Sequence, residues 1–193
     1  MSTIGFMLDY VVEGSCDVVS YISIDSTNQE ALRLCRSGAY RPPFVVVSDT
    51  QTAGRGRHGR EWYSDAKGGL YYTLCLRPDS FERDQLDTIY VRVSGVISET
   101  IESVTGIRAT FKAPNDLYVS GKKLCGTLFQ TTVRRDVLES VVVGIGLNVN
   151  QDTFPEPLSN TATSLYLETG RLYDLSEFVR LLTKELIHVF ERH

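Results

Sequence analysis

The pattern of hydrophobic and polar positions predicts strands and helices along the whole chain. Apolar runs and alternations are typical of strands, and apolar positions recurring every three or four residues are typical of helices. The pattern predicts strands at 4–12, 17–24, 44–48, 68–76, 107–112, 115–120, 122–131 and 140–150. It predicts helices beginning at Ser26 and spanning 84–105, 161–170 and 175–190. We therefore expect an α+β fold, a mixed sheet of roughly six or seven strands with helices on one face.

Local signals set the ends of two predicted helices. Thr27 and Glu30 have the spacing of a capping box at the start of the first helix. Gly38 is suited to the position just past its end, where a left-handed residue is common. Gly106 stops the helix predicted at 84–105 in the same way.

Composition narrows the class of protein. A chain of 193 residues with 42% hydrophobic and 23% charged residues is typical of a single globular domain. The net charge of −4 argues against general nucleic-acid binding, which usually leaves a basic footprint. No apolar run is long enough to span a bilayer, and the N-terminus lacks the basic region of a signal peptide. We therefore expect neither a nucleic-acid nor a membrane partner.

The cysteines and histidines give no sign of a metal centre. The four cysteines are scattered without a CxxC pair, which favours reduced thiols in a cytoplasmic protein. The three histidines do not cluster with cysteines or carboxylates at a ligand spacing, so we expect no metal site built from the protein alone.

The most informative segment runs from Thr50 to Trp62 and reads TQTAGRGRHGREW. Its glycines let backbone approach a ligand closely, and its arginines offer paired donors for phosphate or carboxylate. The spacing GxGxxG also matches the dinucleotide fingerprint, but no helical pattern follows it, as that motif requires. A solvated basic loop is the plain alternative. The pattern favours a loop that closes over an anion.

Two further segments accompany this loop. The segment KAPNDL (112–117) joins two predicted strands and, taken alone, is equally typical of a plain turn. In GKKLCG (121–126), Lys123 could be an ordinary surface lysine, whereas a glycine inside a strand, Gly126, often marks a close approach by a ligand. Gly144 and Gly146 point to one face of the next strand, which indicates either room for a ligand or a bend in the sheet.

The residues Ser26, Thr27 and Asn28 have a default role as helix caps. That role does not exclude a second one, because a helix N-terminus presents free N–H groups to a polar ligand. Trp62 is the only tryptophan, and its place at the exit of the loop suits a lid as well as a core position. No spacing indicates a nucleophilic triad, so any catalysis is expected to be electrostatic.

Taken together, these segments resemble the catalytic domain of biotin protein ligases. That family carries STN at a helix start, QxAGRGRxGRxW, KWPNDL, GKKLxGxL and GIGxNxN in this order. The matching segments here are 26–28, 51–62, 112–117, 121–128 and 144–150, and the resemblance covers about residues 20–190.

The resemblance implies a two-step ligase whose substrates are biotin and MgATP. Biotinyl-5′-AMP and pyrophosphate would form first, and a lysine of the biotin carboxyl carrier protein of acetyl-CoA carboxylase would then accept biotin. The catalytic residues it implies are Lys123, Arg55 and Arg57. The substrate-binding residues it implies are Ser26, Thr27, Asn28, Gln51, Gly54, Gly56, Trp62 and Gly126. The nucleotide-binding residues it implies are Lys112, Asn115, Arg57 and Asn148.

Two departures from the family's pattern matter. Ala113 stands where the family has the tryptophan of KWPND, so another side chain is expected to compensate. Residues 1–193 are expected to be a single catalytic domain, without the N-terminal helix-turn-helix or C-terminal β-barrel of many members. A lipoyl or octanoyl ligase or transferase of the same fold, and a biotin-binding module with weakened catalysis, stay open as alternatives.

Overall fold

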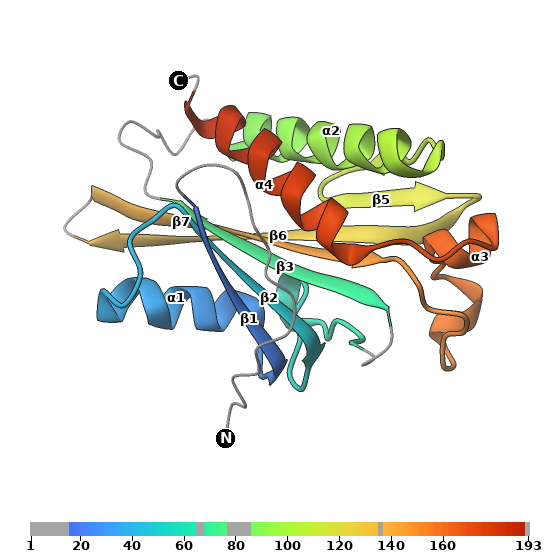
Figure 1. The fold of residues 1–193 in the computed structure, drawn as a ribbon, viewed down its shortest axis with the longest axis horizontal. Coiled ribbons are helices and arrows are strands. Elements are labelled where there is room, and N and C mark those ends of the chain that lie inside the picture. Colours follow the sequence, from blue (N-terminus) through green and yellow to red (C-terminus); the bar gives the residue numbers. More distant parts are fainter. Residues whose placement is uncertain (1–15, 65–67, 77–85, 135–136, 192–193) are drawn as a thin grey trace.

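A seven-stranded mixed sheet runs through the molecule. The computed structural model describes residues 16–64, 68–76, 86–134 and 137–191. The strands lie in the order β1-β2-β3-β7-β6-β5-β4 (Figure 1). They span β1 (Asp17–Ile24), β2 (Phe44–Gln51), β3 (Gly69–Leu76), β4 (Thr110–Lys112), β5 (Asp116–Val119), β6 (Lys122–Arg134) and β7 (Val137–Asn148). Strands β1 and β2 are parallel, and every other neighbouring pair is antiparallel.

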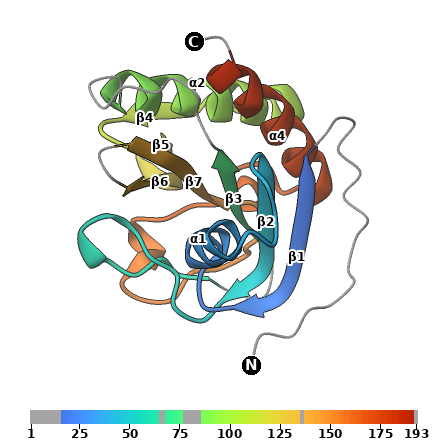
Figure 2. The ribbon, with the colours of Figure 1, turned by 90° about the vertical axis from the view of Figure 1, so that its left-hand side faces the viewer.

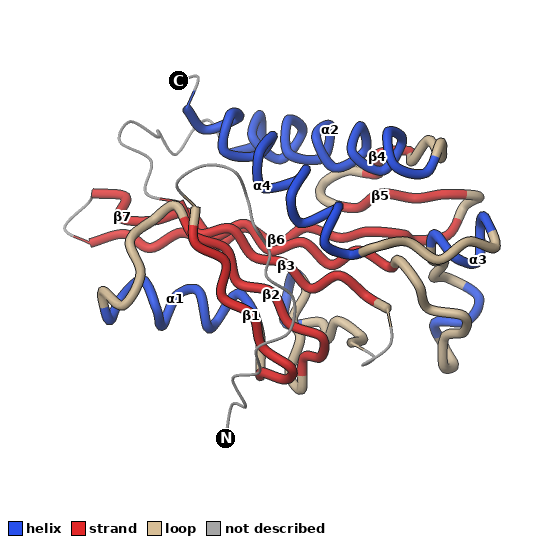
Figure 3. Tube along the Cα trace, in the orientation of Figure 1, coloured by secondary structure: helices blue, strands red, loops and turns tan. Residues whose placement is uncertain are grey.

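Helices cover both faces of this sheet. The helices α2 (Leu86–Thr105) and α4 (Leu175–Glu191) lie on one face, and α1 (Thr27–Ser37) lies on the other (Figures 1 and 3). The side chains of β2 explain the arrangement, because Val45 and Val47 belong to the larger core under α2 and α4, whereas Phe44 and Val46 pack with α1. A strand that is apolar on both faces needs cover on both. The predicted α+β class is confirmed, and its detail of helices on one face is corrected.

Most predicted elements are present with shifted ends. The two strands near the sheet edge are shorter than predicted, at 110–112 and 116–119, and the next strand extends to Arg134. Gly38 and Gly106 take the left-handed conformation expected at helix ends, with φ of 72° and 77°. The strand predicted at 4–12 lies outside the described residues.

The helix predicted at 161–170 is wrong in its first half. Residues 161–163 run beside β6, where the Lys123 N–H donates to Thr161 O (2.8 Å) and the Thr163 N–H donates to Lys123 O (2.9 Å). This pairing replaces helical hydrogen bonds, so helix α3 (Leu165–Thr169) begins only after Ser164. The Ser164 hydroxyl caps it by accepting from the Leu167 N–H at 3.0 Å.

In the part of the chain that the structure describes, no helix is long and apolar enough to cross a membrane.

Candidate active site

One cavity of about 280 Å³ collects most of the residues that the sequence singled out. It lies between the start of α1, the glycine-arginine loop (residues 54–62), the glycine-containing face of β6 and β7, and the segment 154–162. Twelve of the predicted site residues line it: Ser26, Thr27, Asn28, Gln51, Arg55, Gly56, Arg57, Trp62, Asn115, Lys123, Gly126 and Asn148. Gly54 and Lys112 are absent from the lining.

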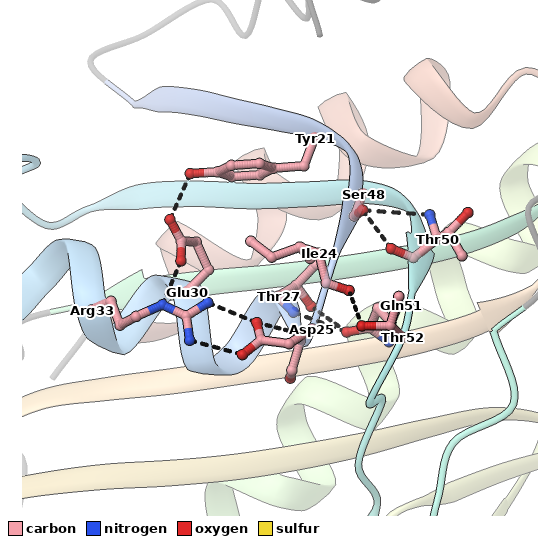
Figure 4. Close-up of polar contacts among 11 residues, drawn as sticks. Tyr21, Ile24, Asp25, Thr27, Glu30, Arg33, Ser48, Thr50, Gln51 and Thr52 are labelled. Atoms are coloured by element: carbon pink, nitrogen blue, oxygen red, sulfur yellow. Dashed lines mark hydrogen bonds and ion pairs between the residues drawn. The ribbon is translucent and has the colours of Figure 1, made fainter. Parts of the chain in front are cut away.

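The start of α1 forms the polar end of the cavity. Ser26 is the N-cap residue, yet its side chain makes no cap hydrogen bond, so this hydroxyl stays available to a ligand. The Thr27 N–H and hydroxyl both donate to Gln51 Oε1, at 2.9 and 3.1 Å (Figure 4). Gln51 also donates to Ser64 Oγ at 3.2 Å. Because only one amide proton is used there, Gln51 retains a donor for a ligand.

The predicted capping box between Thr27 and Glu30 is not formed. Thr27 is the first helical residue rather than the cap, and its hydroxyl is used by Gln51. The Glu30 carboxylate instead accepts from the Tyr21 hydroxyl and from Arg33, both at 2.6 Å (Figure 4). The box therefore gives way to contacts that fasten α1 to β1.

A charged brace holds the turn between β1 and α1. The Arg33 guanidinium donates to both carboxylate oxygens of Asp25, at 2.9 and 2.6 Å (Figure 4). Hydrogen bonds from Arg33 are the main cause that lowers the pKa of Asp25 below its usual range. The brace fixes the turn directly before Ser26, and thereby the polar end of the cavity.

Asn28 is tied to the sheet floor. Its Nδ2 donates to Leu128 O (3.3 Å) and Gln130 Oε1 (3.0 Å), and its Oδ1 accepts from the Thr73 hydroxyl at 2.7 Å. A side chain on Gly144 would collide with this amide. With these bonds already made, Asn28 shapes the cavity more than it offers free groups to a ligand.

The glycine-arginine loop is a short hairpin whose tip is a 3₁₀ turn at Arg57–Gly59. The Trp62 N–H donates to Gly54 O at 2.9 Å, and the Gly56 N–H donates to Arg60 O at 2.7 Å. A Cβ on Gly54 would lie 2.8 Å from Trp62 O. Gly54 therefore supports the base of the hairpin, whereas Arg55 and Arg57 carry its charges to the cavity.

The Trp62 indole rests on bare backbone. Gly126 and Gly146 are directly opposite each other on β6 and β7. A Cβ on Gly126 would lie 2.9 Å from Trp62 Cζ3, and one on Gly146 would lie 2.6 Å from Trp62 Cζ2. Since real Cβ atoms do not approach this closely, the two glycines make the seat of the indole.

Lys123 lies beside this seat with two electrostatic partners. Its Nζ is 2.8 Å from Asp116 Oδ1 and 5.1 Å from the Trp62 ring centroid. The lysine side chain is 31% exposed, so it is held in place without being sealed from ligand. Sequence reasoning quoted Asp116 within KAPNDL but gave it no role; only the folded hairpin brings it to Lys123.

The predicted nucleotide-binding residues differ in position. Asn115 Nδ2 donates to Thr127 O at 2.6 Å while the residue lines the cavity. Asn148 donates to Thr163 O at 2.9 Å and accepts from Gln151 at 3.3 Å, which ties the segment beside Lys123 to β7. Lys112 is exposed, with Nζ 4.5 Å from the Tyr118 ring centroid. Its nucleotide role stays a prediction.

The cavity also has an apolar wall, which was not predicted from the sequence. It consists of Tyr63, Phe154, Leu158 and Ala162. The rings of Tyr63 and Phe154 meet edge to face, with centroids 6.4 Å apart. Residues 154–162 have no periodic pattern, so only their packing against the loop could show that they belong to the site.

The lining suits a ligand that carries a polar group, an anionic group and an apolar part. Arg55, Arg57 and Lys123 supply its positive charge. Among the described residues, no group of three or more histidines, cysteines or carboxylates gathers to hold a metal ion. Arginine and lysine donors of this kind can stabilise negative charge on a bound ligand.

Comparison with known proteins identifies the family. The model of the biotin/lipoate A/B protein ligase family matches residues 20–148. The chain belongs to this family. The matched range includes every strand from β1 to β7 apart from the first residues of β1, and most of the cavity lining.

The chain is similar to known proteins over most of its length. The bifunctional ligase/repressor BirA of Bacillus spizizenii is 40% identical over 154 residues, covering 78% of this chain and 46% of the relative. The biotin–[acetyl-CoA-carboxylase] ligase of Paracoccus denitrificans is 33% identical over 162 residues, covering 82% and 66%. The biotin protein ligase of Aquifex aeolicus, solved in complex with biotin and ATP, is 34% identical with a TM-score of 0.75, covering 91% and 72%. The chain thus spans about half the length of the BirA relatives that it matches.

We expect Gly146→Ala to lift the Trp62 indole from its seat, because the added methyl group would overlap the ring. Trp62 is the only tryptophan, so its fluorescence reports this directly. Emission of the variant should shift to longer wavelength. Gly95→Ala is the matched control, since a Cβ at Gly95 in α2 meets nothing within 4 Å. Unchanged emission in the Gly146 variant would contradict the described seat.

We expect Arg33→Ala to raise the pKa of Asp25 towards its ordinary value. A lowered folded-state pKa stabilises the protein above the unfolded pKa of about 3.9, and this stabilisation is lost as pH falls through the folded pKa. The variant should be less stable by up to about 1 kcal/mol at neutral pH, because both side chains are half-exposed. The difference should shrink in acid.

Urea unfolding at neutral and acidic pH measures this difference in stability. Arg36→Ala, on the same helix and exposed, is the control. A gap between wild type and Arg33→Ala that persists unchanged below the folded pKa would argue against the brace.

Proposed function

We propose that the chain is the catalytic domain of a biotin protein ligase. A carboxylate oxygen of biotin would attack the α-phosphorus of MgATP, releasing pyrophosphate and forming biotinyl-5′-AMP. The ε-amine of a carrier lysine would then attack the acyl carbon, releasing AMP and a proton. The observation that carries this proposal is a single cavity whose lining brings Lys123 and two arginines together with the polar start of α1 and an apolar wall.

The polar end is suited to the ureido ring of biotin. The remaining Gln51 N–H is a donor for a carbonyl oxygen, and the Ser26 hydroxyl can donate to that oxygen or accept from a ring N–H group. A dithiolane ring offers neither group. Because unpaired buried polar groups are costly, this end favours biotin over lipoate.

The centre of the cavity is suited to adenylation. As the new bond forms, negative charge moves onto the α-phosphate and onto the oxygen that bridges the α- and β-phosphates. Lys123, Arg55 and Arg57 all line the cavity in which this charge would develop. Donors fixed before the reaction stabilise such charge without reorganising. The ion pair with Asp116 holds the ammonium ready until an anionic ligand competes for it.

The apolar end is suited to the adenine base. Tyr63, Phe154 and Leu158 offer a surface for a flat ring, which helps to offset the alanine at position 113. Asn115 also lines the cavity. Asn148 we infer to act by holding residues 161–163 beside Lys123, since both ends of its amide are already bonded. Mg²⁺ would arrive with ATP as part of the substrate.

The carrier is proposed from the relatives. The Paracoccus relative is named for acetyl-CoA carboxylase, and we propose the biotin carboxyl carrier protein of that enzyme as the acceptor, in the cytoplasm. The described residues contribute to one sheet, which supports a single catalytic domain.

Isotope exchange between pyrophosphate and ATP tests the reaction class. Exchange should require biotin and should not be supported by lipoate. Exchange with lipoate alone would favour the lipoyl ligase alternative, and binding of biotin without any exchange would favour a binding module.

We expect Lys123→Ala to lower this exchange about 10²–10³-fold, the usual loss for one donor aimed at developing charge. Biotin should still bind measurably in a calorimetric titration, because the polar end is unchanged. Lys122→Ala is the matched control, since its Nζ only approaches Ser159 O at 3.4 Å, outside the cavity lining. Wild-type exchange in the Lys123 variant would exclude the proposed role.

A further inference from the structure

Arg57 contacts an aromatic side chain on the other side of the sheet. Its guanidinium carbon lies 5.9 Å from the centroid of the Tyr90 ring. Tyr90 belongs to α2, which lies across the sheet from α1 (Figure 2), and the start of α1 lines the cavity. A guanidinium within about 6 Å of a ring centroid is attracted by the ring's negative face.

The end of β5 makes this contact possible. The last residue pair between β5 and β6 is Asp116 with Gly126, followed by the bond from the Thr127 N–H to Asn115 O. Beyond that point β6 pairs only with β7 among the described strands. The next two residues point to opposite faces, Leu128 into the cavity and Phe129 into the core under α2. The two faces therefore meet at this edge, which Arg57 spans.

The Tyr90 ring is held in place for this contact. Its centroid is 4.2 Å from that of Phe129, with the planes tilted by 52°. Phe129 is 9% exposed, so it is an anchored neighbour. A ring supported in this way loses little freedom when it receives a cation.

The loop tip gains an anchor that its backbone does not provide. The tip's hydrogen bonds join loop residues to each other, as in Gly56 to Arg60 and Arg60 to Arg57. Towards the body of the protein, the base of the loop is fixed by the Trp62 seat. The Tyr90 contact is a second fixed point, at the far end of the loop.

We propose that Tyr90 is a positioning residue that holds Arg57, and with it the loop tip, closed over the cavity. Tyr90 is absent from the cavity lining and touches no substrate position. It acts through Arg57, which lines the cavity while its guanidinium lies over the ring. The consequence for the proposed ligase, on which this part rests, is longer retention of the adenylate.

Amide hydrogen exchange of residues 54–62 in the ligand-free protein tests the contact without requiring activity. Tyr90→Leu should speed exchange at the tip about two- to fivefold, the size of an exposed cation–π contact. Tyr90→Phe keeps the ring and should match wild type. Val91→Ala is the control for α2, because Val91 is 58% exposed on the same helix.

A second measurement follows the lifetime of the enzyme-bound adenylate after removal of free biotin and ATP. Tyr90→Leu should release biotinyl-AMP about two- to fivefold faster than wild type does. The same change in an Arg57→Gly background should add nothing, because the partner is already absent. An additive effect there would show that Tyr90 acts by another route.

The outcomes separate the two proposals. Rates of amide hydrogen exchange and of adenylate release that are identical in wild type and Tyr90→Leu would overturn the role of Tyr90. If the wild type forms no adenylate, the ligase assignment fails. Amide hydrogen exchange alone then decides whether Tyr90 holds the loop. Faster exchange in Tyr90→Phe as well as Tyr90→Leu would also overturn the proposal, because the ring would then be irrelevant.

Discussion

The close approach of an indole to bare sheet backbone is the constraint on which the site depends. Gly126 and Gly146 face each other across β6 and β7, and Trp62 occupies the space where their side chains would be. This contact fixes one end of the glycine-arginine loop and places aromatic surface beside Lys123. Two residues earlier in β7, on the same face, Gly144 gives the same freedom to Asn28. Removing side chains from one face of two strands thus creates both the cavity and its lid.

Charge is distributed locally rather than over the whole surface. The chain has a net charge of −4, yet the cavity gathers Arg55, Arg57 and Lys123. Asp116 gives the partly buried ammonium of Lys123 a charge partner. An anionic ligand can replace the Asp116 carboxylate as the partner of Lys123 without moving the backbone, since residues 161–163 hold the backbone of Lys123. Such a site is suited to stabilising negative charge that develops on a substrate, rather than to supplying a nucleophilic side chain.

The sequence predicts the elements better than their contacts. The apolar runs identified β2 and β3, and Gly38 and Gly106 marked helix ends correctly, because these are local properties. The same apolar run in β2 also indicates a strand covered on both faces. We nevertheless expected helices on one face only, and the packing of Val45 and Val46 corrects this. Residues 161–163 looked helical by pattern but are held extended by the backbone of Lys123, a partner far away in sequence.

Site residues follow the same division. Those in contiguous motifs, such as Ser26 and Lys123, were predicted and line the cavity. Asp116, Phe154 and Tyr90 were given no role from the sequence, because their contacts depend on pairs formed across the fold. Asn28 and Asn148 were predicted as ligand contacts; both line the cavity, and their amides also bond within the protein.

A crystal structure of this chain grown with biotin and a non-hydrolysable ATP analogue tests the central claim most directly. The account predicts the ureido ring against Ser26, Thr27 and Gln51, with Lys123 Nζ at hydrogen-bonding distance from the biotin carboxylate or α-phosphate. It also predicts the Trp62 indole still seated on Gly126 and Gly146. Biotin bound outside this cavity, or Lys123 still paired to Asp116 with both substrates in place and distant from them, would contradict it.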